Sequence, residues 1–369
     1  MNEKEVFIVV GDTGSAADLV SVAQELEARH VPVKWFADPN GRARIDVLEK
    51  RNIPYSMTHP EEYDGSLPKV ILCGTSSGYA GLQVAWTNFS KAQKPAIPVY
   101  WFEDLWGTGE QENERGADPD VMLVLDELAS KIVLAKRPGI QTRIVRKPTF
   151  GKMPAIEEIP AIRERIRARL RVGESDFLVS WGFQGEPNKM APAHVGEIIR
   201  EKLQLDDGMV VAWRPHPKHL KKDELWATLT NGGIKFVEEA RAVDLLELYL
   251  SSDAVVVPWG GTDGYKAVLR GIPTITPMFP SGKLTRKLYD FDDEESRFSS
   301  GFINGVPPLL MGDLSWGAWS AAHVLKLLVH IRDRPLSSRL VTLERSIPFQ
   351  DLEKPGSAAL IADEIAKHL

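Results

Sequence analysis

Short apolar runs and amphipathic segments alternate along the first 150 residues of the chain. The apolar runs are rich in β-branched residues and end at glycine, proline or polar residues, which is typical of buried strands. Strands are expected at 6–10, 31–36, 69–73, 97–102, 121–125 and 143–145, and helices at 17–29, 43–51, 78–91 and 126–135. This order predicts a parallel sheet covered by helices.

The alternation breaks around Pro148 and Pro154 and restarts after a charged helix at 159–171. Further strands are expected at 177–181, 209–213, 234–237, 254–258 and 274–276, and helices at 192–203, 221–230, 243–251, 263–270, 316–332 and 356–368. The pattern predicts two α/β domains, at 1–150 and 151–335, and a helical tail at 336–369. Open α/β sheets bind ligands at their carboxyl edges, so we expect a ligand crevice between the two sheets.

Composition supports a two-domain globular protein. A chain of 369 residues exceeds the size at which one core keeps growing, and its 43% hydrophobic and 26% charged residues are ordinary for a globular protein. The net charge of −6 argues against a broad basic surface for nucleic acid. The single cysteine, Cys73, excludes a disulfide framework and fits a reducing compartment. No signal-peptide pattern or membrane-spanning run is recognisable, so a cytoplasmic location is expected.

A glycine pair follows one strand of the second half. Gly260 and Gly261 separate the apolar run 254–258 from a short helix that contains Thr262 and Lys266. Glycine lets a ligand approach the backbone, and the free N–H groups of a helix start suit an anion such as a diphosphate. An ordinary strand-to-helix turn is the alternative.

Two further loops carry candidate chemistry. Glu103 and Asp104 follow the strand at 97–102, where one carboxylate could act as a general base toward a substrate hydroxyl; a helix cap or solvated turn is the alternative. Arg214 and His216 follow the strand at 209–213, with prolines fixing the backbone. Both side chains can donate hydrogen bonds to phosphate, although a purely structural histidine is possible.

Tryptophans lie at or just after several strand ends. Indole rings stack on sugars or bases, so these side chains could line a substrate site; the alternative is that they fill a domain interface. The candidates for stacking are Trp101, Trp106, Trp181 and Trp259. No Cys/His cluster has zinc spacing, and no metal site is expected.

Together these elements resemble the GT-B architecture, in which two Rossmann-like α/β domains face a central cleft. It is shared by many nucleotide-sugar glycosyltransferases and by the non-hydrolysing UDP-N-acetylglucosamine 2-epimerases. The segment 97–109 resembles the epimerases, with Glu103 on a family acid, and Gly260-Gly261 matches their diphosphate-binding turn. Thr75 stands where they have a catalytic aspartate, and the histidine expected after Ser180 is absent. These departures disfavour the epimerase reaction.

Two short motifs resemble transferases more closely. Arg214-Pro-His-Pro217 is similar to the His-Pro motif of CMP-sugar and CDP-polyol transferases, whose histidine contacts the nucleotide phosphate. Glu103-Asp104, with Gly107 displaced by two residues, is similar to the bacterial sialyltransferase motif whose aspartate is the general base. Lys266 replaces a ribose-binding glutamate of many UDP-sugar enzymes and cannot accept hydrogen bonds. Either the nucleotide is held differently, or Lys266 neutralises phosphate.

The resemblance implies a metal-independent glycosyltransferase that moves a sugar from a nucleotide-activated donor to a hydroxyl acceptor. Asp104 or Glu103 would take the acceptor proton. The donor phosphate would be held by Arg214, His216, Gly260, Gly261, Thr262 and Lys266. The nucleotide sugar is a substrate, and no additional cofactor is expected. The acceptor stays open among glycans, lipids, small molecules and modified nucleic-acid bases. The alternatives are an epimerase-like isomerase or nucleotide-sugar hydrolase, and a non-catalytic binding subunit on the same fold.

Overall fold

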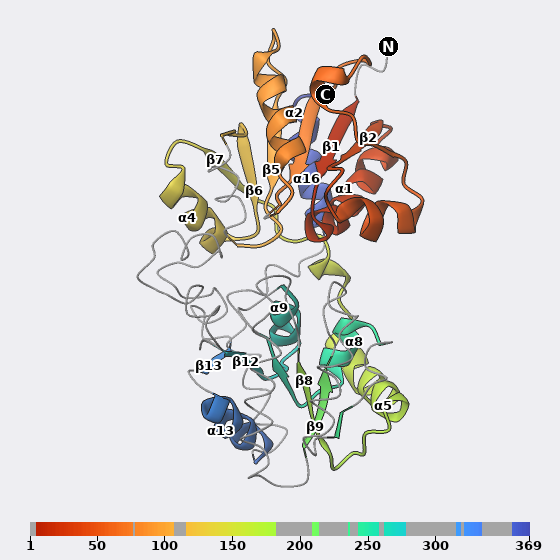
Figure 1. The fold of residues 1–369 in the computed structure, drawn as a ribbon, viewed down its shortest axis with the longest axis vertical. Helices are drawn as coiled ribbons and strands as arrows, with labels where there is room; N and C mark the ends of the chain where they lie inside the picture. Colours follow the sequence, from red (N-terminus) through yellow and green to blue (C-terminus); the bar gives the residue numbers. More distant parts are fainter. Residues whose placement is uncertain are drawn as a thin grey trace. The chain divides into compact units, whose positions relative to one another are not determined.

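The chain divides into two compact units (Figure 1). A computed structural model describes residues 5–76, 78–106, 116–181, 209–213, 235–236, 243–257, 262–277, 315–318, 321–333 and 356–369. One unit comprises Met1–Met153, Arg297–Asn304 and Asp351–Leu369, and the other comprises Pro154–Ser296 and Gly305–Gln350. The end of the chain, expected to form a separate helical tail, therefore belongs to the first unit.

The first unit is built on a seven-stranded parallel sheet with strand order β3-β2-β1-β4-β5-β6-β7. The residues of β1, β4, β5 and β6 are buried, as their apolar sequences predict. The sequence pattern misses β3, which has only two residues. The strands are β1 (Val6–Val10), β2 (Val33–Ala37), β3 (Tyr55–Ser56), β4 (Val70–Gly74), β5 (Val99–Phe102), β6 (Val121–Val124) and β7 (Gln141–Ile144).

Helices cover both faces of this sheet. Trp101 in β5 donates a hydrogen bond from Nε1 to Thr87 Oγ1 in α2, whereas its neighbour Tyr100 contacts His368 just after α16. Neighbouring strand residues point to opposite faces, so α2 and α16 lie on opposite sides of β5. The expected helix at 43–51 forms a π turn followed by a 3₁₀ turn, Arg44–Leu48 and Glu49–Arg51. The described α-helices of this unit are α1 (Thr13–Ala28), α2 (Gly81–Ala92), α4 (Glu127–Lys136) and α16 (Ser357–Ala366).

Helix α16 packs beside α1 and completes the first unit. Arg29, just after α1, pairs with Asp363 at 2.6 Å. On α16, Ile361 is fully buried while the preceding Leu360 is 38% exposed. The apolar face of α16 therefore packs against α1 and covers part of its surface.

Truncation of Ile361 should measure the contribution of α16 directly. Ile361→Ala should lower the free energy of unfolding by about 2–5 kcal/mol, because it leaves a cavity in a closed interface. Leu360→Ala is the matched control and should cost about 1 kcal/mol or less. Urea denaturation of both variants makes the comparison. Equal losses of unfolding free energy in the two variants would contradict the described packing of α16.

The second unit holds a six-stranded parallel sheet with order β10-β9-β8-β11-β12-β13. Its strands are β8 (Phe177–Trp181), β9 (Met209–Trp213), β10 (Lys235–Phe236), β11 (Ala254–Val256), β12 (Thr274–Pro277) and β13 (Trp316–Ala318). Its described α-helices are α5 (Ile159–Arg169), α8 (Leu245–Leu250), α9 (Thr262–Leu269) and α13 (Ala321–Arg332). The expected helices at 192–203 and 221–230 lie outside the described residues. Among the helices that are described, none combines the length and apolar character needed to cross a membrane.

The expected helix at 316–332 is wrong in its first residues. Trp316–Ala318 form the edge strand β13, with Ile275 of β12 opposite Trp316, and the helix begins only at Ala321. Gly317 weakens a helix, and pairing with β12 satisfies the backbone at this position. Pairing with a distant strand therefore overrides a local helical pattern.

A buried ion pair joins α5 to the sheet of the second unit. Asp253, just before β11, accepts hydrogen bonds from Arg163 Nη2 (2.6 Å), Arg167 Nη1 (3.2 Å) and the Leu178 backbone N–H (2.8 Å). Arg167 also donates to the carbonyls of Gly173 and Asp176. This one carboxylate thus ties a helix to the starts of two central strands.

Candidate active site

Polar residues gather at the carboxyl edge of the first sheet. The strand order reverses between β1 and β4, and open α/β sheets bind ligands beside such a reversal. The loops after β1, β4 and β5 all reach this edge. The polar residues described there include Asp12, Thr75, Ser76, Glu103 and Asp104.

The loops after β1 and β4 are joined by hydrogen bonds. Ser76 Oγ donates to Asp12 Oδ2 at 2.8 Å and accepts from the Tyr79 N–H at 2.8 Å. A Cβ at Gly11 would collide with the backbone carbonyl of Tyr79. Gly11 is therefore needed for the close approach of two loops, and it is not part of a three-glycine dinucleotide motif.

The Asp104 carboxyl group lies against the first turn of α1. A Cβ at Gly14 would overlap Asp104 Oδ2, and Thr75 Oγ1 lies 3.5 Å from Asp104 Oδ1, near the limit of a hydrogen bond. The start of a helix carries a partial positive charge, which favours a carboxylate. Helix α1 has no acidic residue in its own first turn. Asp104 therefore adds a negative charge from another loop to that of Asp12, the N-cap residue of α1.

A buried ion pair lies beside Asp104. Lys147 Nζ donates to Asp18 Oδ2 and to the backbone carbonyl of Asp104, both at 2.6 Å. The second oxygen of Asp18 accepts from the Thr149 N–H at 2.9 Å. The Lys147 and Asp18 side chains are 4% and 0% exposed.

Sequence reasoning missed both members of this pair. A signal for Asp18 was present, because a carboxylate occupies a position among the buried residues Ser15, Leu19 and Val22 of α1. Such a residue is rarely buried unless it is paired. Lys147 gave no local signal, since its partners lie far away in the sequence.

Asp104 and Glu103 occupy different environments. Burial raises the pKa of the Asp104 carboxyl to about 6; the Lys147 charge opposes this shift, and the charges of Asp18 and Asp12 add to it. Asp104 keeps partial exposure, whereas Glu103 is fully buried. The Glu103 N–H extends the pairing of β5 with β6 by donating to the Leu123 carbonyl at 2.9 Å. A carboxyl with a pKa near neutrality in a partly exposed residue fits a general base better than the carboxyl of a fully buried residue.

The tryptophans predicted to stack on substrate are packing residues where the structure describes them. Trp101, Trp106 and Trp181 are all at most 2% exposed. Trp106 Nε1 donates to both carboxylate oxygens of Asp126, the residue that caps α4, at 3.0 Å each. The stacking prediction is wrong for these three, because burying an indole ring in its own domain gains more than exposing it.

Most of the predicted donor site lies outside the described residues. Arg214, His216, Gly260 and Gly261 fall in this part, and so does Trp259, which was predicted to stack on substrate. Thr262 is the first residue of α9, which follows β11, and Lys266 lies one turn later and is half-buried. The structure thus places these two residues on one helix.

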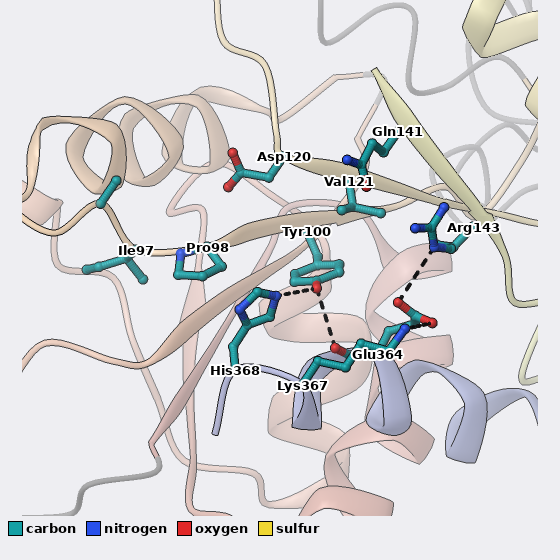
Figure 2. Close-up of a pocket in the computed structure, with 11 residues that line it drawn as sticks. Ile97, Pro98, Tyr100, Asp120, Val121, Gln141, Arg143, Glu364, Lys367 and His368 are labelled. Carbon is teal, nitrogen blue, oxygen red and sulfur yellow. Dashed lines mark hydrogen bonds and ion pairs between the residues drawn. The ribbon is translucent and has the colours of Figure 1, made fainter. Parts of the chain in front are cut away.

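A separate pocket of about 410 Å³ lies near the opposite edge of the first sheet (Figure 2). It is formed by the amino-terminal parts of β5, β6 and β7 together with the end of α16. Tyr100 Oη lies 2.9 Å from His368 Nε2, and Glu364 pairs with Lys367 at 2.5 Å and with Arg143 at 3.9 Å. These polar groups are engaged with one another, so the pocket marks where α16 docks. Among the described residues, no group of three or more His, Cys, Asp or Glu side chains is arranged to hold a metal ion.

Comparisons with known proteins give structural matches only. No protein-family model and no curated protein sequence matches the chain. MurG from Acinetobacter baumannii is similar over 99% of both chains, with a TM-score of 0.60 and 12% identity. The glycosyltransferase SnogD from Streptomyces nogalater is similar over 100% of both chains, with a TM-score of 0.56 and 13% identity.

An isomerase is equally similar in structure. The UDP-GlcNAc 2-epimerase from Methanocaldococcus jannaschii, in complex with UDP-GlcNAc and UDP, has a TM-score of 0.62 and 16% identity over 98% of this chain and 99% of that one. With the two parallel sheets, these similarities show that the chain has the GT-B fold. At such identities the likeness concerns the fold, and the reaction has to be argued from the residues.

Proposed function

We propose that the chain is a glycosyltransferase that moves a sugar from a nucleotide-activated donor to a hydroxyl acceptor, with Asp104 as the general base. The observation that carries this proposal is the Asp104 carboxyl beside the start of α1, in a partly exposed residue, where burial of the carboxyl raises its pKa to about 6. A base with this pKa is mostly ionised at neutral pH and can still accept a proton effectively.

In the proposed reaction, Asp104 accepts the proton of the acceptor hydroxyl while the hydroxyl oxygen attacks the anomeric carbon of the donor. The bond from that carbon to the phosphate oxygen breaks, and the nucleotide leaves with the electron pair. Thr262 and Lys266 on α9, together with Arg214, His216, Gly260 and Gly261, would stabilise the leaving phosphate charge. Preorganised N–H donors and cations can perform this task without a metal.

The second candidate is an epimerase-like isomerase or a nucleotide-sugar hydrolase. It is favoured by the similar epimerase that binds UDP-GlcNAc and by the position of Glu103 on the acid of that family. Against it, Thr75 replaces a catalytic aspartate, and Glu103 is enclosed. A non-catalytic binding subunit on the same fold would have no use for a base at Asp104. Cys73 is buried and forms no disulfide, which supports the cytoplasmic location that we propose.

A thermal-shift screen against UDP, CMP, CDP, GDP and ADP tests the nucleotide part of the proposal. At about 100 times its dissociation constant, a ligand stabilises the native state by about 2.7 kcal/mol, which raises the melting temperature. We expect at least one nucleotide to do so. If none does at millimolar concentration, the nucleotide-sugar proposal is wrong.

The corresponding nucleotide sugars then separate the reactions. A transferase releases nucleotide only when an acceptor is present, so a panel of glycan, lipid and small-molecule acceptors is compared with a mixture that lacks one. An isomerised or hydrolysed sugar without acceptor would favour the second candidate instead.

A further inference from the structure

The backbone of Asp104 accepts a hydrogen bond from a side chain that is distant in the sequence. The carbonyl of Asp104 accepts a hydrogen bond from Lys147 Nζ, and Lys147 follows β7. The same ammonium group donates to Asp18 in α1, which follows β1. Three separate segments of the unit therefore meet at one nitrogen atom.

We propose that Lys147 and Asp18 are positioning residues for Asp104 that also set the charge around its carboxyl group: Lys147 holds the acidic loop in place, and Asp18 holds Lys147. The proposal rests on the proposed function only for the role of Asp104 as the base. Neither residue needs to touch the substrate.

The hydrogen-bond geometry favours this role. An ammonium group has three donors, and two of them are used here on acceptors at 2.6 Å. Asp18 is fixed on both oxygens, by Lys147 and by the Thr149 N–H. Burying an ion pair in this way costs desolvation energy that an apolar pair would avoid. A role in fixing the loop of the general base would explain why this buried pair is charged despite that cost.

The charges of the pair act on Asp104 in opposite directions. The groups that face its carboxyl are Asp12 from the loop after β1, Asp18 from α1, Thr75 from the loop after β4 and Lys147 from the segment after β7. Lys147 lowers the pKa of Asp104, and both aspartates raise it. If the pair only held the loop in place, loss of Lys147 and loss of Asp18 would change the pKa of Asp104 in the same direction.

Two single substitutions distinguish these cases. The pKa of Asp104 is measured by carboxyl carbon NMR in the full chain labelled at aspartate, with Asp104→Asn used to assign the signal. Lys147→Met should raise this pKa, because Asp18 is left as an uncompensated anion. Asp18→Asn should lower it, because the cation is left uncompensated. Shifts in the same direction, or no shift, would overturn the proposal.

Further variants cover the case in which a single substitution does not fold. The double variant Lys147→Met with Asp18→Asn leaves no uncompensated charge, and its Asp104 pKa should lie between those of the two singles. Lys147→Arg keeps the cation and should leave the pKa close to that of the native chain. The charge mechanism would be contradicted if the Asp104 pKa of the double variant lay outside this range. It would also be contradicted if Lys147→Arg shifted that pKa as much as Lys147→Met does.

The measurement needs no substrate, so the two proposals can fail separately. If Asp104→Asn keeps normal turnover, the assignment of the base is wrong even when the pKa shifts occur. If Asp104→Asn is inactive and the shifts are absent, the base stands and the positioning pair does not. In active variants, the acid side of the pH profile should move with the measured pKa.

Discussion

Asp104→Asn should lower turnover by about 10²–10⁴-fold and leave nucleotide binding unchanged. The acceptor hydroxyl is a weak nucleophile at neutral pH, and asparagine cannot take its proton. The substitution is nearly isosteric, so the contact with the start of α1 is kept. Turnover is measured with the natural donor and acceptor, and binding by calorimetry with the nucleotide alone.

The pH dependence of the activity should also report the titration of Asp104. The pKa of Asp104 is raised to about 6, so the carboxyl becomes protonated, and unable to act as a base, as the pH falls below this value. We expect kcat/KM to be level above the pKa and to fall about tenfold per pH unit below it. This decline should be absent from the residual activity of Asp104→Asn. A profile flat down to pH 4 in the native chain would contradict the assignment.

Glu103→Gln is the matched control for Asp104→Asn. It changes the adjacent, fully buried carboxyl group and should leave turnover close to normal. Loss of activity in Glu103→Gln alone would move the chemistry to the epimerase-like assignment. Near-normal turnover in both variants would mean that the acidic loop is structural.

Asp253→Ala should destabilise the second unit by about 3–5 kcal/mol, because it leaves the buried Arg167 guanidinium without its carboxylate. It also removes the acceptor of the Leu178 N–H in β8. Hydrogen exchange of amides in β8 and β11 reports on this unit alone, which matters because two units need not unfold together.

An exposed ion pair in the same unit provides the control. Glu247 and Arg165 pair at 2.7 Å with side chains that are 32% and 56% exposed. Glu247→Ala should therefore change the stability by about 1 kcal/mol or less. If Asp253→Ala costs no more than Glu247→Ala, the Asp253 network does not stabilise the sheet as described.

The central strands could be predicted from the sequence because their apolar runs leave little choice. Val6–Val10 and Phe177–Trp181 form strands with the expected bounds. The edge strands β3 and β13 have two and three residues and exist through pairing with a neighbour, which a local pattern does not contain. The same limit explains the wrong helix start at Trp316.

The candidate site was predictable as a place but not in detail. Strand ends put Glu103 and Asp104 at the carboxyl edge, where the structure has them. Their different exposure depends on the segments packed around them, and so does the burial of Trp101. Lys147 and Asp18 are separated by most of the first unit in sequence, so only the fold brings them together.

The first unit is discontinuous, and this bears on how it can be made. Its seven strands are complete at Ile144, yet α16 comes only after the second unit has been synthesised. Until then, the surface that faces α16 stays uncovered on the nascent chain. A fragment that ends at Met153 would keep this apolar surface exposed and would tend to aggregate. An independent version of the unit would be better designed by grafting residues 356–369 onto that fragment through a flexible linker.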